Sequence, residues 1–262
     1  MPEALIVYLL VALVALLASG LTLFSGFGLG TLLLPAFLLF FPVQPAIAMT
    51  AVVHFLNNLF KLTLVGRTAD RHTVLQFGIP AIAAAFVGAW LLQQLGSLED
   101  LAHYTLFGRQ YVLTATKLLI ALLMLGFALF EASSRSETFV VKDRRFLAAG
   151  GLLSGFFGGL SGHQGAFRSA FLVASGLSKE AFIATGVVIA CLVDLSRLSL
   201  YASSLQHLER THWPLLLTAT IAAFMGAFIG NRLVKKVTIS WLKRLVAVML
   251  CATALLLAAG IL

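Results

Sequence analysis

The chain has 262 residues, of which 60% are hydrophobic and only 11% are charged, whereas about 25% of the residues of an ordinary soluble domain are charged. A soluble fold cannot bury so much apolar surface, which excludes a soluble enzyme, a disordered chain and a secreted disulfide scaffold and predicts a membrane protein. The net charge of +8 falls mostly in short loops between apolar runs. We interpret it as a signal of membrane topology and not as a nucleic-acid surface.

Apolar segments follow one another along the chain, and they fall into two length classes. Seven have about the 20 residues that a transmembrane helix needs: 4–24, 45–65, 73–95, 110–130, 180–203, 213–234 and 239–262. Three are too short to cross the hydrocarbon core at about 1.5 Å per residue: 28–41, 146–160 and 164–176. Glycine-rich breaks adjoin the short segments at 25–30 and 158–165. Because glycine clusters permit a sharp reversal, each break predicts a hairpin inside the membrane.

The two halves of the chain carry the same pattern at one constant spacing. Gly30 aligns with Gly165 and Thr50 with Thr185 without a gap between them. A constant register over this length indicates an internal duplication. The predicted fold is an all-α polytopic membrane protein of two inverted repeats, each with a glycine-broken helical hairpin and three transmembrane helices.

The charges of the loops favour the hairpin arrangement. Three loops are basic, at 67–71, 135–145 and 232–243, whereas the loops at 96–103 and 204–211 are not. If the two segments that flank each glycine break form a hairpin, the three basic loops lie on the same side of the membrane. If the two segments instead cross the membrane together as one span, the basic loop at 232–243 lies on the opposite side from the other two. The positive-inside rule therefore favours hairpins. We expect a first membrane repeat over 1–131, a basic cytoplasmic linker over 132–145 and a second membrane repeat over 146–262.

The two breaks are the first candidate binding site. A helix that begins inside a membrane presents unpaired N–H groups and a partial positive charge, which suits an anion. Transporters use such half-helix ends around a central site. The alternative is that the glycines only permit close helix packing. The candidate substrate-binding residues at the breaks are Gly28, Gly30, Thr31, His163, Gln164 and Gly165.

Polar side chains inside the longer apolar segments are further candidates. His54 and either Asn57 or Asn58 share one helical face with Lys61, and a polar stripe in a membrane faces protein or water. The substrate-binding assignment includes His54 and Asn57. Lys61 is assigned to proton coupling or an ion pair, although it could instead extend to the basic loop.

A buried arginine and a close ion pair complete the candidate residues. Arg168 follows the second break, and a guanidinium can bind an oxyanion with two hydrogen bonds; its alternatives are a structural partner such as Asp194 or an extension toward the membrane surface. Asp194 and Arg197 are three residues apart and form either a local ion pair or a proton-coupling site. No metal site is predicted.

Two glycine and proline patterns resemble those of one known family. The run Ser25-Gly-Phe-Gly-Leu-Gly-Thr-Leu-Leu-Leu-Pro35, followed by Pro45, Ala46 and Thr50, resembles the first-half signature of the sulfite exporter TauE/SafE family. The run Gly151-Leu-Leu-Ser-Gly-Phe-Phe-Gly-Gly159, followed by Ala181 and Thr185, is similar to its second half. The resemblance implies a polytopic carrier of the bacterial inner membrane, without a cofactor, for small sulfur-containing anions such as sulfite and organosulfonates.

The second half departs from the usual family pattern. Ala170 stands at the position that Pro35 holds in the first half, and the break itself contains His163, Gln164 and Arg168. These three residues are therefore the most informative for the choice of substrate.

The predicted function is a secondary transporter, an exporter of a small anion, with alternating access around the two hairpins near the midplane. Titratable groups at His54, His163 and Asp194 make proton coupling an open option. One alternative is an anion channel. Another is an intramembrane serine hydrolase, because Gly159-Leu160-Ser161-Gly162 resembles the GxSG sequence of rhomboid proteases, with His54 as the base. The expected partners are the anion, protons and lipid, and the face from Gly226 to Gly230 is a candidate for a homodimer.

Overall fold

Nearly all of the described chain is helical in the computed structural model, which describes residues 2–25, 28–106, 108–132, 141, 143–206, 212–233 and 239–262. The first half contains α1 (Pro2–Ser25), α2 (Gly30–Leu38), α3 (Val43–Val65), η1 (Gly66–Thr68), α4 (Arg71–Gly96) and α5 (Ala115–Ala132). The second contains η2 (Arg144–Phe146), α7 (Leu147–Ser161), α8 (Gly165–Leu172), η3 (Val173–Ser175), α9 (Lys179–Gln206), α10 (Trp213–Leu233) and α11 (Ile239–Ala258).

The helices have the lengths of a polytopic membrane protein. Within the described residues, five helices are long and apolar enough to cross a membrane, namely α1, α3, α4, α9 and α10. The apolar parts of α5 and α11 are shorter. Several sequence-predicted features lie outside the described residues: Gly26 and Phe27 of the first break, most of the linker 132–145, residues 207–211 of the loop 204–211 and residues 234–238 of the loop 232–243.

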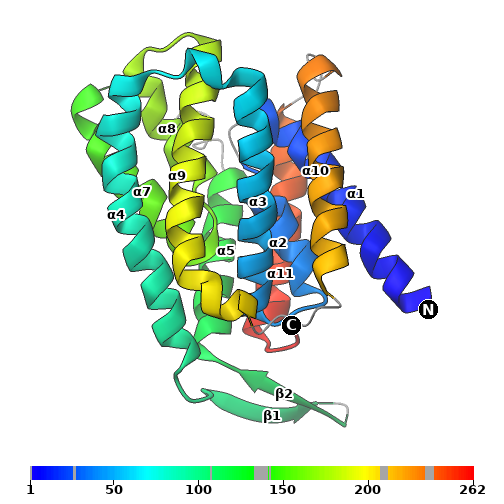
Figure 1. Ribbon diagram of the computed structural model, residues 1–262. Helices are drawn as coiled ribbons and strands as arrows, with labels where there is room; N and C mark the ends of the chain where they lie inside the picture. Colours follow the sequence, from blue (N-terminus) through cyan, green and yellow to red (C-terminus); the bar gives the residue numbers. More distant parts are fainter. Residues whose placement is uncertain are drawn as a thin grey trace.

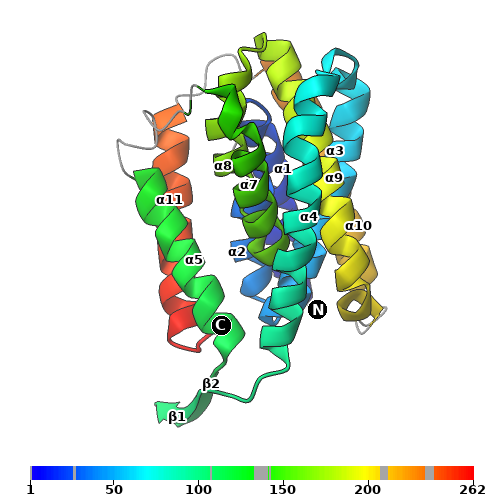
Figure 2. The ribbon, with the colours of Figure 1, turned by 90° about the vertical axis from the view of Figure 1, so that its left-hand side faces the viewer.

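The two short helices that follow the breaks, α2 and α8, each form a hairpin with the helix that precedes them. In Figure 1, α2 returns toward the end of the bundle where α1 begins, and α8 returns toward the end where α7 begins. The next helices, α3 and α9, then run through the bundle in opposite directions. The helix ends that flank the three basic loops lie at one end of the bundle, and α4 and α9 end at the other (Figures 1 and 2). This is the arrangement that the hairpin interpretation requires.

The two halves interlock, because their closest contacts cross from one half to the other. The α1 helix packs on α10, and α7 packs on α4 in the corresponding way. The central pair is α3 with α9, and the peripheral pair is α5 with α11, which Figure 2 shows side by side and antiparallel. The contact of α1 with α10 thus has a counterpart in the contact of α7 with α4, with the halves exchanged.

Glycines permit the close approach of α7 to α4. A Cβ atom added at Gly155 would lie 2.1 Å from the carbonyl oxygen of Ala81, and one added at Gly159 would lie 2.1 Å from that of Ala85. Such distances leave no room for any side chain, so the two backbones are in direct contact. Membrane helices associate in this way because lipid supplies no hydrophobic force between them and close packing has to do so.

The face of α10 that carries Gly226 and Gly230 packs against α1 of the same chain. A Cβ atom at Gly226 would lie 2.1 Å from the oxygen of Leu16, and one at Gly230 would lie 2.7 Å from the oxygen of Gly20. Both contacts are with α1. The prediction that this face mediates a homodimer is therefore wrong, since α1 of the same chain covers it.

A β-hairpin precedes α5, where the sequence predicted one apolar helix from residue 110. Strands β1 (Ala102–Leu106) and β2 (Arg109–Leu113) pair antiparallel, and α5 begins only at Ala115. The Tyr104 hydroxyl of β1 donates a hydrogen bond to the Ala259 oxygen, and Lys117 of α5 donates through Nζ to the Val112 oxygen of β2 at 2.9 Å and to the Gly260 oxygen at 3.2 Å. These contacts hold the hairpin against the carboxyl-terminal end of the chain.

Candidate functional site

The two glycine breaks meet in the middle of the bundle. Each contains one glycine in the left-handed region, Gly28 with φ of 84° and Gly162 with φ of 83°, a conformation that other residues rarely adopt. A Cβ atom at Gly30, the first residue of α2, would lie only 3.4 Å from the oxygen of Gly162. The structure therefore brings together two backbone breaks that are far apart in the sequence.

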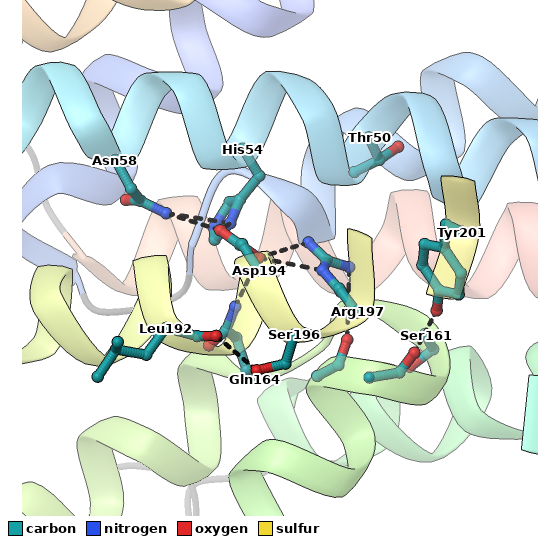
Figure 3. A network of polar contacts seen from close by, with 12 residues as sticks. Thr50, His54, Asn58, Ser161, Gln164, Leu192, Asp194, Ser196, Arg197 and Tyr201 are labelled. Carbon is teal, nitrogen blue, oxygen red and sulfur yellow. Dashed lines mark hydrogen bonds and ion pairs between the residues drawn. The ribbon is translucent and has the colours of Figure 1, made fainter. Parts of the chain in front are cut away.

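A buried carboxylate beside the breaks organises the polar side chains (Figure 3). Asp194 on α9 is fully buried. One of its oxygens, Oδ2, accepts hydrogen bonds from His54 Nδ1 at 2.6 Å and from Asn58 Nδ2 at 3.3 Å, both on α3. Because an ionised carboxylate only accepts hydrogen bonds, the His54 ring must carry a proton on Nδ1.

The second oxygen of Asp194, Oδ1, accepts hydrogen bonds from two residues of the second half of the chain. Arg197 donates to Oδ1 through Nε at 3.0 Å and through Nη2 at 2.8 Å, and Gln164 Nε2, at the second break, donates to it at 3.1 Å. The structure thus contains the Asp194–Arg197 ion pair that the sequence offered as one alternative. Donors from α3, α9 and the second break compensate the buried negative charge.

Two further cations lie beside this network and line one small cavity. Its lining includes Arg168 of α8, Lys61 and His54 of α3 and Gly28 of the first break, and its volume is about 40 Å³. Only 8% of Arg168 and 4% of Lys61 are exposed to solvent. A cavity of this size holds a few water molecules or an ion of similar dimensions.

The charges around the cavity are unbalanced. Arg168 Nη1 donates to Gln164 Oε1 at 3.2 Å, and Lys61 Nζ donates to the Asn57 amide oxygen at 3.2 Å when that amide is oriented to suit its neighbours. Both acceptors are neutral amides. Among the residues that the structure describes, no carboxylate forms an ion pair with Arg168 or Lys61. A buried cation that contacts only neutral acceptors is costly unless an anion joins it, so this arrangement can bind one.

Most of the sequence-predicted site residues lie at the cavity or beside it. His54, Lys61, Arg168 and Gly28 line it, and Gln164 bridges Arg168 to Asp194. Gly30 and Gly165 are the first residues of α2 and α8. The alternative in which Lys61 extends to the basic loop does not occur, because Lys61 is buried at the cavity.

Three of the predicted residues do not line the cavity. Thr31 Oγ1 donates to the oxygen of Gly28 and so ties the first break to α2. Asn57 contacts Ser19 Oγ of α1 at 3.0 Å. The His163 ring stacks on Phe127 with 4.9 Å between centroids, and His163 does not line the cavity.

The polar stripe left Asn57 and Asn58 as alternatives, and the substrate-binding assignment took Asn57, whereas the structure places Asn58 at Asp194. Asn58 lies one helical turn after His54, lines the cavity and bonds Asp194. Both asparagines fall within one turn on the polar stripe, so the spacing alone does not separate them. Only the position of α9 beside α3 decides between them.

The serine of the GxSG sequence does not meet His54. Ser161 Oγ donates to the oxygen of Phe157 at 3.1 Å and lies 3.1 Å from His163 Nδ1, whereas His54 is bound to Asp194. Within the described residues, His163 Nε2 has no hydrogen-bond partner, so no third polar group orients this ring through a hydrogen bond. A nucleophilic serine requires a base oriented in that way, and the predicted Ser161–His54 pair is absent.

One comparison with known proteins identifies a relationship. A family model described as Sulfite exporter TauE/SafE matches residues 11–257, nearly the whole chain. No curated protein sequence matches the chain.

Proposed function

The chain belongs to the sulfite exporter TauE/SafE family, a family of membrane transporters, and from this premise we propose that it is a secondary transporter of a small sulfur-containing anion such as sulfite or an organosulfonate. One observation carries the proposal. Arg168 and Lys61 are buried, line one cavity where the two breaks meet, and have no carboxylate partner among the described residues. An anion that enters this cavity supplies the missing negative charge.

We further infer that the two halves are inverted repeats and that transport proceeds by alternating access. The supporting observations are the opposite directions of α3 and α9 and the exchange-symmetric packing of α1 on α10 and α7 on α4. A site at the interface of two such repeats can open to either side when one repeat rocks against the other. The proposed transport is export across a bacterial inner membrane, with the basic loops in the cytoplasm and residues 1–131 and 146–262 as the repeats.

Uptake by proteoliposomes tests the proposal. Purified protein is reconstituted, and uptake of sulfite, thiosulfate and ethanesulfonate is measured for wild type, Arg168→Ala and Arg67→Ala. Arg67 lies exposed in η1 and serves as a matched loss of one positive charge. The proposal predicts saturable uptake of at least one anion that Arg168→Ala loses and Arg67→Ala keeps.

Two results would count against it. If none of the three anions enters above the rate of empty liposomes, the sulfur-anion substrate class is wrong. If uptake is the same in Arg168→Ala, the cavity is not the binding site. Preloading with unlabelled anion separates the alternatives, because a carrier then exchanges it for external label at an accelerated rate, whereas a channel gives conductance without this acceleration.

A further inference from the structure

His54 is held in one orientation by its partner on α9. The ring is 2% exposed, and its Nδ1 lies 2.6 Å from Asp194 Oδ2. The proton of the neutral ring is therefore on Nδ1, and the lone pair is on Nε2. Nε2 points to the first break, where a Cβ atom at Gly28 would lie 3.4 Å from it. Both residues line the cavity.

From this geometry we propose that His54 is the proton-carrying residue of the site, and that its Nε2 takes up one proton when an anion occupies the cavity. The inference rests on the proposed function and adds the coupling residue and its stoichiometry. The step is a simple proton transfer: the Nε2 lone pair accepts a proton from water, the ring becomes an imidazolium, and the proton returns to water when the anion leaves.

The charged groups around His54 explain why its protonation follows the anion. Asp194 of α9 favours a charged His54 ring through their direct contact, and Arg197, which pairs with Asp194, offsets part of this effect. Arg168 of α8 and Lys61 of α3 leave a net positive charge at the cavity. Among the described residues that line the cavity, no other group can be charged. A positive His54 is therefore disfavoured when the cavity is empty, and a bound anion removes this repulsion.

The same charges give His54 a second role in binding. A protonated Nε2 is a hydrogen-bond donor directed at the cavity, so it adds a charge-assisted contact to those of Arg168 and Lys61. Because the coupling is reciprocal, a proton strengthens anion binding by the factor by which the anion strengthens proton binding. A dianion that travels with one proton still carries one negative charge, which an inside-negative membrane potential drives outward.

Asp194 is less suited to this task than His54. Its two oxygens accept hydrogen bonds from Arg197, Gln164, His54 and Asn58. Protonation of the carboxylate would remove the negative charge that compensates buried Arg197, which is strongly unfavourable. Asp194 is thus the fixed counter-charge that orients His54 and stabilises its imidazolium form.

The pH dependence of thiosulfate binding tests this assignment. Thiosulfate keeps its charge from about pH 5.5 to pH 8.5, the range in which a histidine titrates, so a change in affinity reports the protein. For wild type in detergent, the affinity is expected to fall by up to tenfold per pH unit, the limit for one linked proton, between the pH at which His54 of the empty site titrates and the higher pH at which His54 of the occupied site titrates. In His54→Gln the slope should disappear, because the Gln amide can still donate to Asp194 but cannot take up a proton.

A second buried histidine provides the matched control. His163 is also buried but stacks on Phe127 and does not line the cavity, so His163→Gln should keep the wild-type slope. If His54→Gln does not fold, proton uptake by Lys61→Gln replaces it: thiosulfate at a saturating concentration, added to weakly buffered protein in the pH range where the wild-type affinity changes, should still bind with uptake of up to one proton per anion.

The outcomes separate this inference from the proposed function. Thiosulfate binding with a pH-independent affinity, binding without proton uptake, or an unchanged slope in His54→Gln would each refute the role of His54 and leave the anion site intact. Absence of thiosulfate binding at every pH would contradict both.

Discussion

Gly155 is the position at which the packing of α7 on α4 can be tested most directly. A Cβ atom there would lie 2.1 Å from the Ala81 oxygen and 2.6 Å from its Cα, whereas unstrained carbon contacts are about 3.5 Å or longer. In Gly155→Ala the two helices must therefore move apart. Overpacking of this kind costs about 1–3 kcal/mol, and the better helix propensity of alanine returns about 1 kcal/mol. We expect a net loss of stability of up to about 2 kcal/mol.

Thermal unfolding in detergent measures this loss, and α5 supplies the control. A Cβ atom at Gly126 would have no atom within 4 Å, so Gly126→Ala should gain about 1 kcal/mol from helix propensity alone. For a chain of this size each kcal/mol shifts the midpoint by about 2–4 °C. Gly155→Ala should unfold below wild type and Gly126→Ala at or above it. If Gly155→Ala were as stable as Gly126→Ala, the direct backbone contact would be refuted.

Two other predictions concern the cap of α4 and the second break. Asp70 Oδ1 accepts from Thr73 N at 2.8 Å, and hydrogen bonding from Thr73 lowers the pKa of the Asp70 carboxyl. The cap therefore stabilises the fold above the unfolded-state pKa and is lost as the pH falls through the folded-state value. Asp70→Ala should cost about 1 kcal/mol at neutral pH, with a difference that shrinks below about pH 4; a difference in unfolding midpoint that does not change with pH would contradict this. Gln164→Glu places a carboxylate beside Arg168 Nη1, where it competes with the anion for the guanidinium and should weaken thiosulfate binding more than tenfold. Binding is measured by titration, and an unchanged affinity would show that Arg168 is not part of the anion site.

Local patterns were enough to predict the hairpins and the cavity-lining cations. Glycine clusters next to segments too short to span the membrane indicated where the backbone reverses. The seven-residue spacing of His54 and Lys61 placed both on one face of α3. The positive charges of the loops favoured a hairpin at each break over one continuous membrane crossing. In each case the signal lies within one helix or loop, so the sequence contains it directly.

The contacts between distant segments could not be predicted in this way. The hydrogen bond from His54 to Asp194 joins two residues of different halves, and no periodicity encodes such a partner. The stacking of the His163 ring on Phe127 of α5 is a contact of the same kind, which no local pattern encodes. The strands β1 and β2 are short and pair only with each other, so their signal was weaker than that of the apolar run that follows.

Equilibrium binding of labelled thiosulfate to purified protein tests the central claim, that Arg168 and Lys61 hold an anion where the breaks meet. The account predicts that Arg168→Gln and Lys61→Gln each weaken binding by about 10- to 100-fold, the effect of a lost hydrogen bond from a charged group. Arg67→Gln, which removes an exposed charge, should bind as wild type does. Wild-type affinity in both cavity variants, or an equal loss in Arg67→Gln, would contradict an anion site in this cavity.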